Sequence, residues 1–156
     1  MGFLIDTSIW IAIERGQIGA ADIHAITRQA PVYVSPVNIA ELRFGIGLMR
    51  DPAQKLKAGA MLRRMMRKPL LRITGETADV FGRLAADLTL AGRGVEFRVQ
   101  DLWLAAQAVQ RGFEILTFNA KDFQDVPGLK LTVIPSALVS GFGVLTILAR
   151  SDHRSG

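Results

Sequence analysis

A chain of 156 residues, of which 49% are apolar and 21% charged, is long enough for one compact domain with its own core. It contains no cysteine, which excludes disulfides and thiolate metal sites, and its two histidines, His24 and His153, match no zinc-binding spacing. The formal net charge of +5 favours polyanionic partners. Because Asp6 interrupts the first apolar run, we expect no signal peptide and a cytoplasmic protein.

Short apolar runs alternate with longer helical patterns along the chain. The apolar runs predict strands at residues 2–6, 32–34, 70–73, 114–118 and 131–134. The patterns between them predict helices at residues 7–15, 20–30, 36–49, 53–68, 76–91 and 99–111. Strands joined by helices of this length indicate parallel pairing through right-handed crossovers. The predicted fold class is therefore α/β, a three-layer α/β/α sandwich with a central, mainly parallel sheet.

The end of the chain differs from the rest. No internal repeat, low-complexity tract or linker divides residues 1–135, so we expect them to form one domain. Residues 136–149 are largely apolar but too short to span a bilayer, and either dock to a partner or cover the core. Residues 150–156 are polar, and we expect them to be disordered. Residues 136–156 are therefore treated as an extension of the domain.

Most of the positive charge comes from one segment, residues 43–72. It holds nine basic residues, among them Arg63, Arg64 and Arg67, against a single acid, Asp51. A phosphate backbone could dock on such a segment. The alternative is an ordinary solvated helix face, and the charge pattern alone does not choose between the two interpretations.

Polar residues follow two of the predicted strands. Asp6 ends the first strand, and Asn119 comes directly after the strand that ends at Phe118. Because ligands of parallel α/β sheets lie beyond the carboxyl ends of the strands, both side chains are expected at the same edge. The alternative for Asn119 and Asp122 is an ordinary turn after a strand.

Two further acids lie inside apolar helical stretches. Glu41 is in register with an apolar stripe formed by Val37, Ala40, Phe44 and Leu48. Asp101 is in register with another, formed by Leu104, Ala105 and Ala108. At these spacings both acids are expected to lean toward the interior of the protein and not toward water.

Acids on apolar faces are costly unless another group compensates their charge. Mg²⁺ and Mn²⁺ prefer hard oxygen ligands and are often held by a few carboxylates and water molecules. Such an ion can activate water and offset the charge that builds up on a phosphodiester. The expected convergence of Asp6, Glu41 and Asp101 at one sheet edge therefore indicates a divalent cation site.

Each acid also has a simpler interpretation. Asp6 could cap the helix that follows it, and Asp101 could cap a helix that starts nearby. Glu41 could pair with Arg43 at a helix surface, which is the more common role of a helical glutamate. Their coincidence at one predicted sheet edge in a basic protein favours the metal site.

Four segments of the chain carry these residues, and they occur in a specific order: Leu4–Ser8, Val37–Gly45, Val99–Ala106 and Leu116–Phe123. Together they resemble the PIN-domain ribonucleases, specifically the VapC toxins of VapBC-type (type II) toxin–antitoxin systems. The resemblance extends from Phe3 to about Pro135. Each segment alone is unspecific, but the four in order at these separations are a strong signal.

The resemblance implies an Mg²⁺- or Mn²⁺-dependent endoribonuclease that leaves 5′-phosphate and 3′-hydroxyl ends. Asp6, Glu41 and Asp101 would be the acidic triad of the family. Asp6 and Asp101 would bind the metal directly, and Glu41 would help to orient the attacking water. The fourth acidic position of the family falls on Asn119, which keeps an oxygen ligand but loses a negative charge. Asp122 is the alternative for that position.

The resemblance also implies roles for other residues and a set of partners. Thr7 and Thr117 would donate hydrogen bonds to the carboxylates or to the scissile phosphate. Arg63, Arg64 and Arg67 would hold the RNA, a transfer or ribosomal RNA. A homodimer and a cognate VapB-type antitoxin are expected, without a membrane. The antitoxin would contact apolar residues of the two helices predicted at 36–49 and 53–68, namely Leu48, Met49, Met61, Leu62, Met65 and Met66. For half of these residues, packing between the two helices is the alternative.

Two other functions compete with this interpretation. In a haloacid-dehalogenase-type phosphatase the nucleophilic Asp also ends the first strand, but a second Asp is expected two residues later, where this chain has Ser8. A non-catalytic PIN-like RNA-binding protein is the other alternative. The three acids argue against it, whereas Asn119 is compatible with it. EDTA-sensitive RNA cleavage would identify the nuclease, and turnover of small phosphomonoesters would identify the phosphatase.

Overall fold

The computed structural model describes residues 1–96 and 98–135, so both predictions for the extension, residues 136–156, lie outside the described residues. The elements in chain order are β1 (Phe3–Ile5), α1 (Thr7–Glu14), α2 (Ala20–Ile26), β2 (Val32–Tyr33), α3 (Pro36–Leu48), α4 (Pro52–Met65), α5 (Gly75–Leu90), α6 (Val99–Arg111), β3 (Glu114–Thr117), the 3-10 helix η1 (Ala120–Asp122) and β4 (Lys130–Val133). Among the described residues, no helix is both long and apolar enough to cross a membrane.

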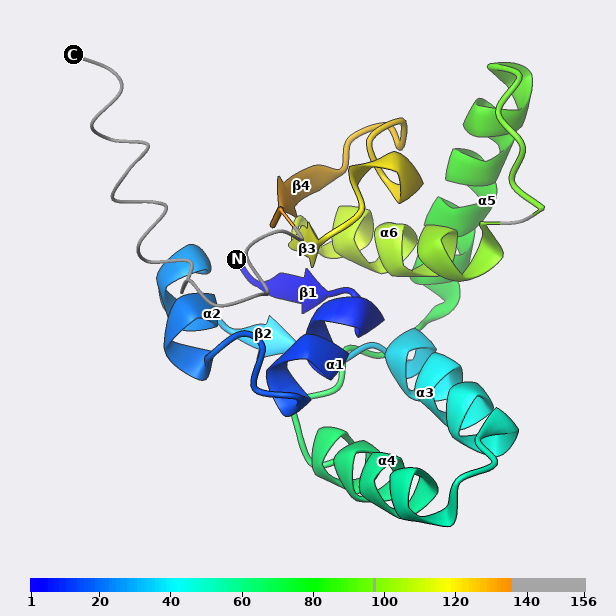
Figure 1. Cartoon of the computed structure of the whole chain (residues 1–156). Helices are drawn as coiled ribbons and strands as arrows, with labels where there is room; N and C mark the ends of the chain where they lie inside the picture. Colours follow the sequence, from blue (N-terminus) through cyan, green and yellow to red (C-terminus); the bar gives the residue numbers. More distant parts are fainter. Residues whose placement is uncertain (97, 136–156) are drawn as a thin grey trace.

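The four strands form one parallel sheet in the order β2-β1-β3-β4. Helices α5 and α6 lie on one face, and α1 and α2 lie toward the other, with α3 and α4 extending from the sheet as a helical hairpin (Figure 1). The predicted α/β/α sandwich is confirmed. Because all four strands run in the same direction, their carboxyl ends lie along one edge.

Alternating side chains of the central strands build two cores. Leu4 and Ile115 belong to the core under α5 and α6, whereas Ile5 and Leu116 belong to the core that contains residues of α1 and α4. Neighbouring residues of a strand point to opposite faces, so a buried central strand is apolar throughout. All four side chains are fully buried, which fixes the register of β1 against β3.

The predicted strand at residues 70–73 is wrong. Only an isolated bridge joins Leu70 to Val34, closed by backbone hydrogen bonds from Val34 to Pro69 and from Leu71 to Val34. The pairing stops there because α3 starts at Pro36 and leaves no further extended residues to pair with.

The apolar stripe that we expected to bury α3 is also wrong. Phe44 and Leu48 are 69% and 67% exposed. The buried face of α3 carries Asn38, Leu42 and Ile46 instead, together with Val37. Apolar residues occur on more than one side of α3, so their spacing alone does not predict which side is buried against the rest of the protein. Glu41 lies at the boundary of the buried face and is half-buried.

A buried amide fixes the start of α3. The Ser35 hydroxyl accepts a hydrogen bond from the backbone N–H of Val37 at 3.0 Å and donates one to Oε1 of Gln107 in α6. Nε2 of Gln107 donates to the carbonyl of Leu71 at 2.7 Å. Because both Ser35 and Gln107 are fully buried, these bonds satisfy polar groups that would otherwise destabilise the fold. The network holds α3 and α6, which carry two of the predicted acids, at a fixed separation.

Candidate active site

Asp6 lies where β1 ends and α1 begins. Its backbone N–H donates to the carbonyl of Leu116 at 2.9 Å, which continues the pairing with β3. Its side chain makes no capping hydrogen bond to α1. Instead, its Oδ2 accepts a bond from the Thr117 hydroxyl at 2.8 Å, and a longer one from Ser8 at 3.4 Å. The carboxylate is therefore held toward the sheet edge and not used as a helix cap.

Asn38 positions Thr7, a residue that acts on the carboxyl of Glu41. Nδ2 of Asn38 donates to the carbonyl of Ile5 at 3.1 Å and to Oγ1 of Thr7 at 3.0 Å. Because Oγ1 accepts this bond, the Thr7 hydroxyl has its proton available for the carboxyl of Glu41, and the influence of Thr7 lowers the pKa of that carboxyl. Burial has the larger effect, so the pKa is raised overall, and the charge of Asp6 raises it further. Asn38 and Thr7 are both buried.

Asp101 is in the first turn of α6, whose N-cap residue is Arg98. The pKa of Asp101 is raised to about 7, mainly by burial and then by the charges of Asp122, Asp6 and Glu41, in that order. The charge of Arg98 acts in the opposite direction. The negative charges of the other three acids in this region therefore all raise the pKa of Asp101.

The fourth carboxylate of the region belongs to Asp122 and not to the predicted Asn119. Nδ2 of Asn119 donates to Oδ2 of Asp122 at 2.7 Å, and its Oδ1 accepts from the backbone of Lys121 at 3.3 Å. The charge of Asp122 raises the pKa of both Asp6 and Asp101. Asn119 thus holds the side chain of Asp122, an acid whose charge acts on Asp6 and Asp101, while the side chain of Asn119 itself is exposed.

The four acids share one space at the carboxyl edge of the sheet. The pKa values of Asp6, Glu41 and Asp101 are all raised, first by burial and then by neighbouring acids. Within the part of the chain that the structure describes, no three His, Cys, Asp or Glu side chains are close enough to enclose an ion directly. Mg²⁺ keeps several water ligands and uses only one or two carboxylates. A hard-oxygen site with excess negative charge therefore fits a partly hydrated divalent cation.

The basic segment is solvent-facing. All nine basic residues between positions 43 and 72 are exposed: Arg43, Arg50, Lys55, Lys57, Arg63, Arg64, Arg67, Lys68 and Arg72. Arg64 forms an ion pair with Glu14 of α1, so part of its charge is already neutralised. The Lys68 ammonium lies 5.5 Å from the ring centroid of Trp10. Arg63 and Arg67 are in no ion pair among the described residues.

A groove of about 780 Å³ lies between α1, α3 and α4. Its lining is Thr7, Ile11, Glu14, Arg15, Glu41, Leu42, Gly45, Ile46, Met49, Gln54, Lys57, Ala58, Met61 and Arg64. Glu41 and Thr7 connect it to the carboxylates. Of the residues predicted for a partner surface, Met49 and Met61 line the groove, but Met61 is buried in the core together with Leu62 and Met65. Leu48 and Met66 are exposed.

Sequence reasoning missed two residues that hold the acids in place, Asn38 and Arg98. The sequence did contain a signal for Asn38, which lies in an apolar helix three residues before Glu41. A side-chain amide that is buried on such a face needs hydrogen-bond partners. Arg98 precedes Asp101 by three residues, but its contacts are to the turn after β3, and sequence separation hides them.

Comparisons with known proteins agree with this geometry. The PIN domain family model matches residues 3–129. Ribonuclease VapC1 of Rickettsia felis is 30% identical over 139 residues, covering 87% of this chain and 98% of the relative. Ribonuclease VapC of Rickettsia bellii is 31% identical over 136 residues, covering 86% and 98%.

Solved structures of low sequence identity show the same fold. VapBC2 from Rickettsia felis, bound to a DNA fragment from its promoter, superposes with a TM-score of 0.71 at 18% identity, covering 86% of this chain and 99% of that one. DNA-bound VapBC from Salmonella typhimurium gives a TM-score of 0.70 at 21% identity, covering 85% and 98%. The chain therefore belongs to the PIN-domain family and, within it, to the VapC ribonucleases, the metal-dependent toxins of type II toxin–antitoxin systems.

Proposed function

We propose that this chain cleaves RNA in the cytoplasm as the toxin of a type II toxin–antitoxin pair, using Mg²⁺ or Mn²⁺ bound at the carboxylates of Asp6, Glu41, Asp101 and Asp122. The observation that carries the proposal is the position of partly buried acids around the carboxyl edge of the sheet, where Asp6 follows β1 and is bonded to Thr117 at the end of β3. Burial and neighbouring acids raise the pKa values of Asp6, Glu41 and Asp101 there. Buried like charges destabilise a fold unless they are neutralised. A divalent cation is the group that would neutralise them here.

The roles of the residues follow from their contacts. Asp6 and Asp101 would hold the cation, and Thr117 keeps the Asp6 carboxylate directed toward the site. The bound cation would acidify water and stabilise the negative charge on the phosphate. Glu41 would orient the attacking water and accept its proton, since a raised pKa suits a carboxylate to that task.

Two predicted residues take different roles in this proposal. Asp122 would supply the fourth negative charge, and Asn119 would position it through the 2.7 Å hydrogen bond. The hydroxyls of Thr7 and Thr117 are directed to carboxylates, so we assign them to holding these acids and not to binding the phosphate.

Metal removal tests the proposed reaction. The purified chain is incubated with end-labelled RNA in Mg²⁺, in Mn²⁺, and in EDTA. We expect cleavage in both metals, none in EDTA, and 5′-phosphate ends on the products, which ligate directly to an adaptor. Cleavage that is equal with and without EDTA would contradict the proposal. A lack of cleavage together with RNA binding would instead support the non-catalytic alternative.

The exposed basic segment would hold the RNA backbone. Replacing Arg63 and Arg67 by Gln should weaken RNA binding about tenfold at low salt and reduce the slope of log Kd against log salt by about one for each phosphate that the variant no longer binds. Arg64→Gln should have a smaller effect, because Arg64 is paired with Glu14. Binding is measured in EDTA by fluorescence anisotropy, with Arg93→Gln as the control. Wild-type affinity and slope in the double variant would remove this segment from the RNA-binding surface.

The groove between α1, α3 and α4 is the proposed binding site of a VapB-type antitoxin. An apolar segment could contact the partly exposed Ile11 and Met49 there, and it would approach Glu41 from the same side. Met side chains adapt to irregular partners.

A homodimer is also proposed from the family, and the exposed Phe44 and Leu48 on α3 are candidate contacts for it, because monomers seldom expose large apolar side chains next to each other. Residues 136–156 remain a proposed extension of the domain.

A further inference from the structure

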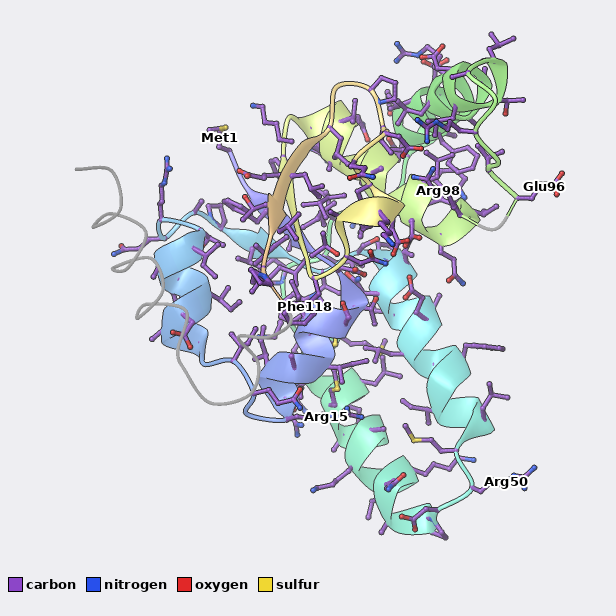
Figure 2. The ribbon with its side chains drawn as sticks, turned by 45° about the horizontal axis from the view of Figure 1, so that its top comes forward. Met1, Arg15, Arg50, Glu96, Arg98 and Phe118 are labelled. Carbon is purple, nitrogen blue, oxygen red and sulfur yellow. The ribbon has the colours of Figure 1, made fainter. Side chains whose placement is uncertain are left out.

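Arg98 joins two segments that carry acids of the site. It is the N-cap residue of α6, in whose first turn Asp101 lies. Its two terminal nitrogens donate to the two carboxylate oxygens of Asp125, each at 2.7 Å. One of them also donates to the backbone carbonyl of Asp122. Figure 2 shows Arg98 at the start of α6, beside the segment that contains η1.

These bonds fix Asp122 from a second direction. Its side chain is held by Nδ2 of Asn119 at 2.7 Å, and its carbonyl is held by Arg98. The turn after β3 is therefore tied to the start of α6 by a bidentate pair, a geometry that restricts orientation as well as distance. Replacing Arg98 would remove the hydrogen bond that links the carbonyl of Asp122 to the start of α6.

The charge of the pair is balanced. Arg98 and Asp125 are only 20% and 14% exposed, and the hydrogen bonds from Arg98 lower the pKa of Asp125. Because Asp125 pairs with the guanidinium, only part of the charge of Arg98 acts on the acids, and it opposes but does not cancel the rise in the pKa of Asp101. The site keeps the excess negative charge that a cation requires.

Stability alone gives a poor account of this arrangement. Buried ion pairs contribute little net stability, because desolvation offsets the attraction. In addition, Nε of Arg98 is buried and has no hydrogen-bond partner within residues 1–96 and 98–135, which is unfavourable. The Arg83–Asp79 pair on α5 has none of these features, since its side chains are 70% and 72% exposed.

We infer that Arg98 and Asp125 are positioning residues, which set the carboxylates of Asp101 and Asp122 for divalent cation binding. The inference rests on the proposed metal site. Residues that orient metal ligands in this way typically change metal affinity by 10- to 100-fold when they are replaced. Arg98→Gln and Asp125→Asn should therefore both weaken cation binding.

The test is a titration of the full chain with Mn²⁺, in which free Mn²⁺ is measured by electron paramagnetic resonance. We expect the half-saturating Mn²⁺ concentration to rise at least about tenfold in Arg98→Gln and in Asp125→Asn. Arg98→Lys should lie between them and the wild type, because a lysine keeps the charge but lacks the bidentate fork. The matched controls Arg83→Gln and Asp79→Asn remove the exposed pair and should stay within about twofold of the wild type.

Thermal melting of each variant separates positioning from stability. A lower melting temperature with unchanged Mn²⁺ affinity in folded Arg98→Gln would overturn the inference and leave only a structural role. If Arg98→Gln does not fold, Arg98→Lys and Asp125→Asn decide by the same criterion. If the wild type itself binds no Mn²⁺, the proposed metal site is wrong and the positioning role falls with it, whereas equal binding by wild type and variants contradicts the positioning role alone.

Discussion

Asp6→Asn is expected to lower RNA cleavage by about 10³-fold, which corresponds to about 4 kcal/mol of transition-state stabilisation. The substitution keeps the size of the side chain and an oxygen that Thr117 can donate to, but it removes one negative charge from the proposed metal site. Because burial and the neighbouring Asp122 raise the pKa of Asp6, removing its charge should not destabilise the fold. Initial rates on end-labelled RNA, with circular dichroism melting of the same samples, measure both effects.

Asp79→Asn is the matched control for this substitution. Asp79 is on α5, its side chain is 72% exposed, and it pairs only with Arg83 among the described residues. The control should cleave RNA at the wild-type rate. If Asp6→Asn retained more than about a tenth of wild-type cleavage, Asp6 would not be a metal ligand of the reaction.

Asp101→Asn is expected to abolish cleavage and also to stabilise the metal-free protein at neutral pH. The pKa of Asp101 is raised from 3.8 to about 7, mainly by burial and by Asp122. A carboxyl whose pKa is higher in the folded state binds its proton more tightly there, so stability falls as the pH rises from about 4 to about 7 and is constant above that. Because Asp101 is half-buried, solvent screening reduces this cost to about 1–2 kcal/mol.

Thermal melting in EDTA across this pH range measures the effect. The wild type should lose about 2–8 °C between pH 5 and pH 8 more than Asp101→Asn does. The control Asp79→Asn should show the same pH dependence of the melting temperature as the wild type. Saturating Mg²⁺ should raise the wild-type melting temperature most above pH 7, where Asp101 carries its charge. Parallel curves for the wild type and Asp101→Asn would show that the pKa of Asp101 is not raised in the folded protein.

Much of the fold follows from local sequence signals. The strands that pair over three or four residues are β1, β3 and β4, and their positions agree with the predicted runs to within one residue. β1 and β3 are apolar runs that each end just before a helix. The strand predicted at Leu70 fails for a reason that lies elsewhere in the chain: its partner strand ends before Pro36. Strand pairing needs a partner of matching length, and an apolar run does not contain that information.

The acids of the site are easier to find from the sequence than the groups that hold them. Asp6 and Asp101 can be recognised from their placement after a strand and on an apolar helix. The sequence leaves the fourth position open between Asn119 and Asp122, because the two side chains lie in one turn and form a hydrogen bond that only the folded chain reveals. The contact of Arg98 with Asp125 spans 27 residues, so only the folded chain reveals it.

The central claim is that distant carboxylates share one divalent cation, and crystals grown or soaked with Mn²⁺ test it most directly through anomalous scattering. We predict one strong anomalous peak at the carboxyl edge of the sheet, with an oxygen of Asp6 and an oxygen of Asp101 each within roughly 2.5 Å of it. Water should complete the remaining coordination. A fully occupied Mn²⁺ elsewhere, or no peak beside these two acids at saturating Mn²⁺, would contradict the account.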